Sequence, residues 1–398
     1  MKQYLNLLKS NKTVRTLSTI QLLSYFGAWF SHVGVFTLLI ELNAPVWMIS
    51  LTVAMAFIPN VILAPISGII IDRFKAYPLF LLFLTIQATT VLLLLLVRDL
   101  SWFWFLQVLV FIRMGTSGIY FQTEMSLLPK ILNENDLKLA NEIHSIIWAV
   151  SYTLGMASAG IFINFFGVYA SFKFDFIIFL IGIFLLLKLN LKEKQEKIKK
   201  GALIMMIEGF IYLKKNPLLI NLILIHGFVA VTSYDTLINI LAKYSYKGVL
   251  STALVIGFIN AFRAFGLVVG PMIFSKRTNK KTLFYLFILQ GIGLFSWAVL
   301  QHNLYLSFIG LFITGLSTST LWSYTYTLVQ VYCDKRFYGR VIAYLDMVYL
   351  GLATITSLFT GFLYEKGLSP FMITMLIGVH FILAGLFYKR VYDKSLAS

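Results

Sequence analysis

Residues 68–75 read Gly-Ile-Ile-Ile-Asp-Arg-Phe-Lys, a short charged loop between two long apolar runs. Charged side chains are costly beside the hydrocarbon of a membrane, so they are rare where two spans meet. A loop this rich in charge between two apolar runs predicts a hinge or a gate.

The composition around this loop predicts a polytopic helical membrane protein. Hydrophobic residues make up 59% of the 398-residue chain and charged residues only 12%, and the mean hydropathy is +0.84. The apolar residues come in runs of about 20, the length that an α-helix needs to cross a bilayer. Strands of a membrane β-barrel would alternate polar and apolar residues instead, so the predicted fold class is an all-α membrane protein.

Reading the apolar runs in order predicts twelve transmembrane helices. The predicted spans are 17–41, 47–71, 78–97, 101–123, 140–165, 168–188, 217–242, 250–274, 282–300, 303–328, 341–363 and 369–388. Because the number of spans is even, both termini are expected on the same side of the membrane.

The basic residues indicate which side that is, because Lys and Arg favour cytoplasmic loops. The termini, a central linker and alternate loops hold 26 of the 33 Lys and Arg residues, whereas the opposite loops hold five. Both termini are therefore predicted to be cytoplasmic. The net charge of +17 follows from this topology. It does not indicate nucleic-acid binding, because the basic residues are scattered over short loops.

The basic N-terminus and the single cysteine narrow the class further. A basic segment followed by a long apolar span, with no small-residue cleavage site, predicts a signal anchor. Cys333 is the one cysteine in the chain, so no disulfide can form within it, and no metal site is expected.

The longest polar stretch, residues 188–200, lies almost at the midpoint and separates six spans from six. It predicts an N-terminal half, 1–188, a cytoplasmic linker, 189–216, and a C-terminal half, 217–398. Residues 204–215 have apolar positions at helical spacing and are expected to lie along the inner membrane surface. Two halves of similar length indicate an internal repeat, and such repeats in transporters place the substrate site between the halves near the midplane.

The pattern Gly68-x-x-x-Asp72-Arg73 resembles the signature that the major facilitator superfamily carries between spans two and three. The resemblance covers essentially the whole chain, although Ala76 and Tyr77 stand where the signature has its next basic residue. It implies twelve helices in two six-helix halves that rock about a central site.

In this family reading the opening stretch is a gate. Gly68 would allow close helix approach, while Asp72 and Arg73 would pair with neighbouring helix ends and lock one conformation. Arg340 and Asp346 are expected to act in gating as well. The corresponding turn after span eight, residues 270–277, carries Lys and Arg but no acid, so the acid-base lock is predicted for the first half alone.

Several stretches are similar to a branch of exporters that includes macrolide-efflux and enterobactin-export proteins. They are Gln21-Leu-Leu-Ser-Tyr-Phe-Gly27, Leu127-Leu-Pro129, Asp136-Leu-Lys-Leu-Ala-Asn141, Glu208-Gly-Phe-Ile-Tyr-Leu213 and Gly339-Arg340-Val341. The sequence differs from the pattern of these exporters at two places, so its motifs do not establish proton antiport. Ala28 stands where many such exporters have an acid, and residues 155–160 lack the proline of the antiporter pattern.

Ionisable residues within spans are candidates for coupling or cavity charge, because burying them is costly. In the first half these are His32, Arg113 and Glu124. Arg113 lies near the middle of span four and is expected to face the central cavity. Glu124 is either a structural partner for Arg73 or another gate cation, or a coupling carboxylate. His32 is either a titrating group that replaces the acid absent at Ala28 or a packing residue.

In the second half the candidates are Asp235 and Arg263. They either form an interhelical ion pair, or Asp235 reaches the outer surface beside Lys243. Asp346 has two readings, a cytoplasmic gate or a proton acceptor.

Aromatic residues suggest the character of the substrate. Trp322, Tyr324 and Tyr326 follow a small-residue stretch in span ten, and together with Trp29 and Trp148 they are predicted to line an aromatic cavity. Such walls suit amphipathic or planar organic molecules, including cations held by ring faces. The alternative is that these rings face lipid or other helices.

These observations predict a secondary active transporter, not an enzyme, in the bacterial plasma (inner) membrane. The favoured mode is proton-coupled efflux of an amphipathic small molecule, resembling a drug or a siderophore, by a monomer surrounded by membrane lipid and without a cofactor. The sequence has no phosphate-binding Gly-Lys-Ser/Thr loop, which argues against ATP-driven transport on this chain. A lysophospholipid transporter or flippase and a small-nutrient symporter are alternatives of the same fold. A non-transporting sensor or scaffold is the alternative from another class.

Overall fold

The computed structural model describes residues 2–189, 191 and 202–396, and it is built from helices and short turns. Within these residues, twelve helical segments are long and apolar enough to cross a membrane. The predicted all-α fold class and the number of spans are thus confirmed.

Two compact units divide the chain. The first draws on residues 1–43 and 65–200, and the second on residues 44–64 and 201–398. An early segment, 44–64, therefore groups with the second half of the chain. The predicted division at 1–188, 189–216 and 217–398 stays a prediction, because residue 190 and residues 192–201 of the linker lie outside the described residues.

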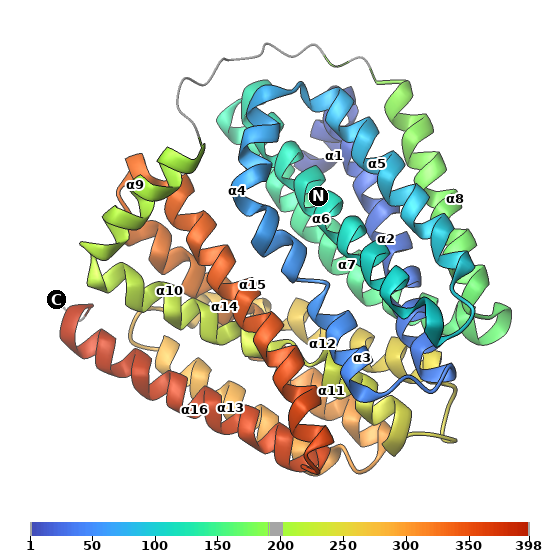
Figure 1. Ribbon diagram of the computed structural model, residues 1–398. Helices are drawn as coiled ribbons and strands as arrows, with labels where there is room; N and C mark the ends of the chain where they lie inside the picture. Colours follow the sequence, from blue (N-terminus) through green and yellow to red (C-terminus); the bar gives the residue numbers. More distant parts are fainter. Residues whose placement is uncertain (1, 190, 192–201, 397–398) are drawn as a thin grey trace. The chain divides into compact units, whose positions relative to one another are not determined.

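The first unit is built on a long central helix. Its helices are α1 (Lys2–Ser10), α2 (Lys12–Glu41), the C-terminal part of α4 (Ile58–Arg73), α5 (Ala76–Leu93), α6 (Phe103–Ile131), α7 (Glu134–Phe166) and α8 (Val168–Leu187). Helix α2 packs against both α7 and α8, and α5 packs against α6 and α8 (Figure 1). Gly167, with a φ of +79°, ends α7 and lets α8 begin at once, because glycine adopts this conformation without strain.

The second unit contains the other helices. They are α3 (Val46–Ala54), α9 (Ala202–Lys214), α10 (Pro217–Val229), α11 (Asp235–Ile240), α12 (Thr252–Phe274), α13 (Leu283–Leu300), α14 (Leu304–Tyr332), α15 (Tyr338–Glu365) and α16 (Pro370–Ser395). Helix α14 packs against α12 and α13, α10 packs against α14, α15 and α16, and α3 packs against α15 (Figure 1).

The second predicted span is broken, and the charged stretch after it is helical. Residues 55–57 form a turn between α3 and α4. Pro59, the second residue of α4, has no backbone N–H to donate to the carbonyl of Met55, so the two helices cannot join into one regular helix there. Helix α4 then continues through Gly68 to Arg73, so only Phe74 and Lys75 separate it from α5. The prediction of a loop over 68–75 was wrong, because apolar Ile69–Ile71 continue the helix.

The seventh span is also interrupted. After α10 the chain forms a single 3-10 turn, Ala230–Thr232, before α11 begins at Asp235. The ladder of i to i+4 helical hydrogen bonds is broken here. The Thr232 carbonyl accepts from the Tyr234 N–H two residues on, and its second lone pair can accept from another helix. Interrupted helices in transporters use such backbone groups at their sites.

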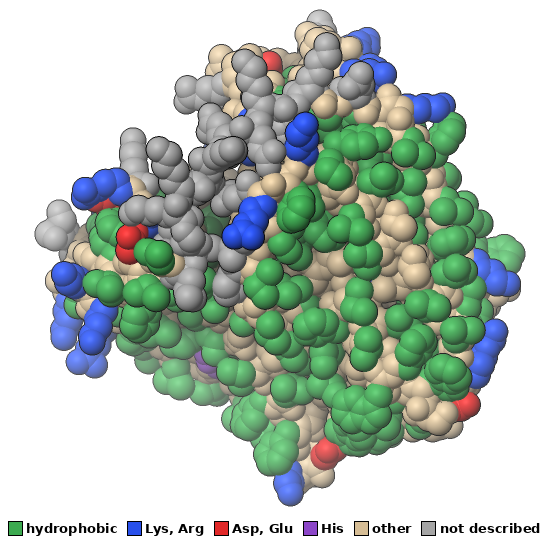
Figure 2. Space-filling view, turned by 45° about the horizontal axis from the view of Figure 1, so that its top comes forward, with side chains coloured by type: hydrophobic (Ala, Val, Ile, Leu, Met, Phe, Trp, Pro, Cys, Tyr) green, Lys and Arg blue, Asp and Glu red, His purple; other side chains and the backbone are tan. Residues whose placement is uncertain are grey.

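The surface is apolar over wide areas. Figure 2 shows hydrophobic side chains spread over the visible face, with most Lys and Arg side chains along its margins. Large residues such as Phe184, Phe265 and Leu383 are half-exposed in the middle of helices. Such a surface is stable only in contact with lipid, which supplies the apolar surroundings that water does not.

Candidate functional site

A buried ion pair is the most unusual feature of the first unit. Arg113 of α6 donates from Nη2 to Oδ2 of Asp175 in α8 at 2.6 Å. Ser31 of α2 donates to the same carboxylate oxygen. Asp175 is fully buried, and its Oδ1 has no hydrogen-bond partner among the described atoms. Arg113, which the sequence analysis predicts to face the central cavity, thus has a buried carboxylate as its partner.

The close approach of α2 and α8 explains how Asp175 reaches this position. A Cβ added to Gly27 would lie 2.5 Å from Asp175 Oδ1, and one added to Gly34 would lie 2.6 Å from Ser171 Oγ. The absence of side chains at these two positions brings α8 against α2, as small residues do between membrane helices. The Asp175 carboxylate therefore lies against Gly27, the residue that precedes Ala28.

Asp175 was not among the residues predicted from the sequence. It is the single acid in the apolar run Val168–Leu187, and a lone carboxylate within a span is a signal that could have identified it. Lys173 lies two residues before Asp175, so this part of the sequence resembles the charged end of a helix at the membrane surface. That resemblance conceals the lone carboxylate within the span.

Glu124 is buried among other polar side chains of the same unit. It is 4% exposed and within electrostatic reach of the Tyr25 and Tyr120 hydroxyls. Nearby, Gln21 hydrogen-bonds the ring of His144. No Lys or Arg side chain that the structure describes pairs with Glu124, so the reading that pairs it with Arg73 is not supported. Its reading as a coupling carboxylate stays a prediction.

Trp29 and Trp148 both contact the ring of Tyr152, a residue that was not predicted from the sequence. Tyr152 of α7 stacks on Trp29 with ring centres 4.5 Å apart, and it lies 5.3 Å from Trp148. His32 meets Trp29 edge-on. The Trp29 Nε1 is buried without a hydrogen-bond partner among described atoms. This cluster of His32, Trp29, Tyr152 and Trp148 spans α2 and α7.

In the second unit, Arg263 lies at the centre of a polar network. Its Nη2 donates to the Thr232 carbonyl at 2.6 Å, and its Nη1 lies 4.0 Å from Asp235 Oδ2. The guanidinium also lies over the ring of Tyr234. The expected approach of Arg263 and Asp235 is therefore present, although at 4.0 Å it is an ion pair without a direct hydrogen bond.

Two further contacts define the surroundings of this network. Gln290 of α13 donates to the Tyr234 hydroxyl at 2.9 Å and accepts from Ser317 of α14 at 2.5 Å. Lys243, which the sequence reading placed beside Asp235, instead donates to the carbonyl of Ala44. The network thus joins α10–α11, α12, α13 and α14 around one cation.

The predicted aromatic residues of span ten divide between two faces of α14. Trp322 and Tyr326 stack with ring centres 5.2 Å apart, because residues four apart share a helix face. Tyr324 points elsewhere, within electrostatic reach of Lys280, so the prediction that it shares a wall with the other two was wrong. The bond from Lys280 to the Tyr332 hydroxyl, 2.6 Å long, raises the pKa of that lysine.

A histidine and a carboxylate accompany the Trp322–Tyr326 stack. His226 of α10 is fully buried, with its ring 5.7 Å from Trp322, 5.6 Å from Tyr326 and 5.1 Å from Tyr349 of α15. Asp346, one turn before Tyr349, is exposed and lies within electrostatic reach of the Tyr326 and Tyr349 hydroxyls. We call these five residues the aromatic–acid cluster.

Among the predicted gating residues, Arg340 has a clear partner. It forms an ion pair with Glu208 of α9 at 2.9 Å, so two of the stretches quoted for the exporter resemblance meet in space. Gly68 shows no close packing, since an added Cβ would meet no described atom within 4 Å. Arg73 is exposed, and the side chain of Asp72 lies outside the described part of the structure.

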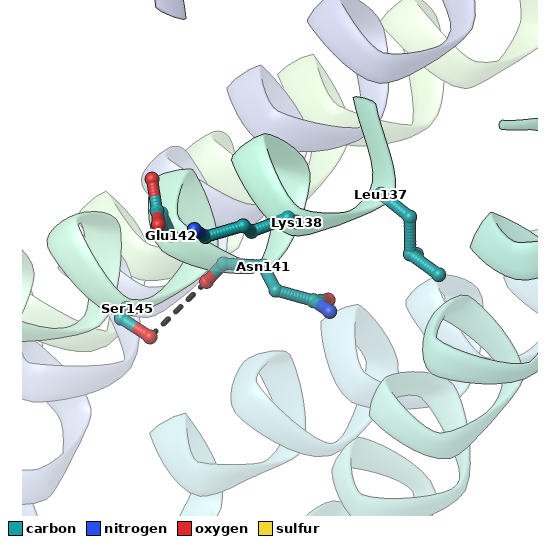
Figure 3. A pocket seen from close by; sticks show the side chains of 5 residues that line it. All are labelled: Leu137, Lys138, Asn141, Glu142 and Ser145. Atoms are coloured by element: carbon teal, nitrogen blue, oxygen red, sulfur yellow. Dashed lines mark hydrogen bonds between the residues drawn. The ribbon is translucent and has the colours of Figure 1, made fainter. Parts of the chain in front are cut away.

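A surface hollow of about 400 Å³ lies along the start of α7, lined by Leu137, Lys138, Asn141, Glu142 and Ser145. Figure 3 shows that these side chains come from successive turns of one helix, with Ser145 Oγ bonded to the Asn141 carbonyl. The Tyr4 hydroxyl donates to Glu142 at 2.8 Å, which raises the pKa of Tyr4. None of the predicted site residues lines this hollow.

Metal chemistry has no evident site in the described residues. No group of three or more His, Cys, Asp or Glu side chains in that part of the chain could hold a metal ion. Two buried arginines are instead paired across helices, Arg113 with Asp175 and Arg263 with the Thr232 carbonyl.

Twelve apolar spans with buried charges at helix contacts define a polytopic membrane protein. Residues 17–349 match the family model of the Major Facilitator Superfamily. The chain belongs to the Major Facilitator Superfamily.

Individual relatives agree with this assignment. The chain is 28% identical over 221 residues to the uncharacterized MFS-type transporter YfiS of Bacillus subtilis (strain 168), which covers 54% of this chain and 52% of that protein. The matched region thus spans about half the length of the curated relative.

Solved structures show the same fold. The nucleoside transporter NupG superimposes with a TM-score of 0.76 at 12% identity, covering 96% of this chain and 99% of that one. A bacterial homolog of the human lysosomal transporter Spinster, inward-facing and unoccupied, gives 0.72 at 16% identity and covers 100% and 98%. Identities this low establish the fold alone.

Proposed function

We propose that this protein is a secondary active transporter that exports an amphipathic small molecule in exchange for protons. Membership of the superfamily supports small-molecule transport by alternating access of the two halves. The observation that carries the coupling proposal is the buried Asp175 carboxylate, with one oxygen held by Arg113 and Ser31 and the other unpartnered.

This arrangement can link a proton to a conformational change. In the charged state, Asp175 neutralises Arg113, and the pair ties α6 to α8. A proton arriving at Oδ1 removes the negative charge, so Arg113 is left as an unbalanced cation in an apolar bundle, which is costly. Relief of that cost requires α6 and α8 to move or Arg113 to find another anion.

We propose that Asp175 takes the place of the acidic residue that span one lacks. Ala28 leaves α2 without the carboxylate of the related exporters, but Asp175 projects from α8 against Gly27, the adjacent residue. In this proposal the carboxylate is supplied by α8 instead of α2, at a similar position within the first unit. Glu124 and His32 are proposed as further proton carriers, and the Asp235–Arg263 pair as a charge relay in the second unit.

The substrate character follows from the aromatic clusters. The rings of Trp29 and Trp148 meet through Tyr152, and those of Trp322 and Tyr326 stack. Ring faces of this kind suit flat, amphipathic organic molecules. They support the proposal of a drug-like or siderophore-like substrate and of a place in the macrolide-efflux and enterobactin-exporter branch.

The remaining features of the proposal come from the sequence. We propose that Gly68, Asp72 and Arg73 gate the cytoplasmic side, that Arg340 contributes through its pair with Glu208, and that the protein is a monomer in the bacterial plasma (inner) membrane with both termini cytoplasmic. The excess of Lys and Arg in alternate loops supports that orientation.

Flux measurements in proteoliposomes test this proposal. The purified protein is assayed against a panel of drug-like and siderophore-like compounds, with and without an imposed pH gradient. We expect gradient-driven flux of at least one compound, and we expect Asp175→Asn to lose at least about 90% of it, since the neutral amide can no longer exchange a proton. Lys173→Gln, an exposed position on the same helix, is the matched control and should keep wild-type flux.

Two results would contradict the proposal. Flux that is indifferent to the pH gradient would remove proton coupling, and full gradient-driven flux by Asp175→Asn would remove Asp175 from it. Movement of lysophospholipid between leaflets without a gradient would favour the lipid-transporter alternative.

A further inference from the structure

The carboxylate of the aromatic–acid cluster has no basic side chain paired with it in the part of the chain that the structure describes. No Lys or Arg of the described residues pairs with Asp346. Arg263, the cation within electrostatic reach of Tyr349, is engaged with the Thr232 carbonyl and Asp235. Asp346 therefore presents a carboxylate that the neighbouring side chains do not balance.

Asp346 also indicates that its helix face adjoins water. It lies within the membrane-spanning helix α15 and is exposed. A carboxylate that faces hydrocarbon within a span is unfavourable, so this exposed one, about two turns into α15, indicates that its helix face adjoins a polar pathway. Tyr349 lies one turn further along the same face of α15, which places it on this wall as well.

His226 supplies a second unsatisfied acceptor. The Thr325 hydroxyl already donates to the Leu321 carbonyl at 2.7 Å, so it accepts from the Nδ1–H of His226, which lies 2.8 Å away. This assigns the proton to Nδ1 and leaves Nε2 as an acceptor. The Nε2 atom is buried and without a partner among the described atoms.

The rings beside these acceptors form a partly open platform. Trp322 is 41% exposed and stacks at 24° on Tyr326. Aromatic faces attract cations through their quadrupole, and indole does so most strongly. These groups favour the same kind of ligand. The carboxylate and the ring faces attract positive charge, and the imidazole acceptor attracts an N–H donor.

We propose that the aromatic–acid cluster is a binding subsite for an organic cation, an ammonium group carried on a flat aromatic body. The ammonium pairs with Asp346, and the aromatic body lies on Trp322 and Tyr326, whose rings contact the His226 ring that carries the unpartnered Nε2. This inference rests on the proposed transport function and names a substrate class for it.

Equilibrium binding to the purified full-length protein in detergent tests the subsite without any gradient. The two probes are naphthylmethylammonium and naphthylmethanol, which match in size and differ in charge, and calorimetry gives their dissociation constants. We expect the wild type to bind the ammonium at least about tenfold more tightly than the alcohol, because it gains both the ion pair and the ring-face attraction.

The variants separate charge from stacking. Asp346→Asn should bring the two probes within about threefold of each other, and Asp346→Glu should restore the preference. Trp322→Ala should weaken both probes by a similar factor, because it removes the platform and keeps the charge. Tyr324→Ala, on the other face of the same helix, is the matched control and should bind like the wild type. Size-exclusion profiles check that each variant is folded.

The outcomes distinguish this inference from the proposed function. Equal affinity of the wild type for both probes, or a preference that survives in Asp346→Asn, overturns the subsite. Loss of binding on Tyr324→Ala equal to that on Trp322→Ala overturns it too, even if Asp346→Asn does not fold. Proton-driven flux of other compounds without ammonium binding leaves the transport proposal standing, whereas ammonium binding without flux of any compound removes transport and keeps the subsite.

Discussion

Single buried charges carry much of the information in this chain. Arg113 was recognisable from the sequence because it lies in mid-span, where its side chain cannot reach either surface. The identity of its partner was not recognisable, because Arg113 and Asp175 are far apart in the sequence and meet only when α6 packs beside α8. The pairing is therefore a property of the packing.

Removing Asp175 should be strongly destabilising, since it leaves Arg113 as an uncompensated buried cation. We expect Asp175→Ala to lower the free energy of unfolding by about 3–5 kcal/mol. The double variant Arg113→Met, Asp175→Leu should recover most of that loss, because two apolar side chains of similar volume need no partner. Unfolding by a denaturing detergent, followed by circular dichroism, measures both values. Equal stability of Asp175→Ala and the wild type would contradict a structural role for the pair.

Residue spacing predicted some site contacts and missed others for a geometric reason. Trp322 and Tyr326 meet because they are four residues apart on α14, while Tyr324, between them, points to a different face. Spacing along the sequence could not predict that Trp29 and Trp148 belong to one cluster, because they lie on different helices. Tyr152, which contacts both rings, lies on α7 with Trp148 and meets Trp29 only because α2 packs against α7.

At the scale of the helix, small residues determine which elements meet. Helices α12 and α14 cross so closely that a Cβ on Gly315 would lie 2.5 Å from the Arg263 carbonyl, and Cβ atoms on Gly266 and Gly270 would overlap the Phe312 and Leu316 carbonyls. The neighbouring atoms are backbone, which cannot move aside. Close backbone contact of this kind is a main source of helix association in lipid.

Substitution at the α12–α14 crossing should therefore separate the helices. We expect Gly270→Val to lower the free energy of unfolding by at least about 1–3 kcal/mol, the cost of overpacking. The matched control is Gly351→Ala in α15, where an added Cβ meets no described atom within 4 Å, and where alanine favours the helix by up to about 1 kcal/mol. The same unfolding assay compares them. A Gly270→Val protein as stable as Gly351→Ala would refute the crossing as described.

The hydropathy of the sequence could not predict where helices are interrupted. Spans two and seven read as continuous apolar runs, but the chain turns at residues 55–57 and again at residues 230–234. A hydropathy window counts apolar side chains and does not register backbone hydrogen bonds. The break in span seven is nevertheless what allows Thr232 to hold Arg263.

For the whole molecule, the distribution of charge and the hydropathy agree on a single topology. Twelve spans and the bias of Lys and Arg toward alternate loops predict both termini in the cytoplasm. Fusion reporters test this orientation directly. Alkaline phosphatase fused after residue 398 should be inactive, while green fluorescent protein fused there should fluoresce. Phosphatase inserted at residues 98–100 should be active, and the opposite pattern would reverse the predicted orientation.

The sequence by itself determined the fold class, the number of spans and the superfamily resemblance, because these depend on run length, composition and short motifs along the chain. It also located most of the charged and aromatic residues that the buried clusters contain. Only the tertiary structure decided which of them meet. It placed Asp175 on Arg113, left Glu124 without a cation in the described residues, and gathered His226, Trp322, Tyr326, Tyr349 and Asp346 around an unbalanced negative charge. The physical reason is that contacts between membrane helices are determined by close packing at small residues and by pairing of buried polar groups, and both depend on side chains from distant parts of the chain.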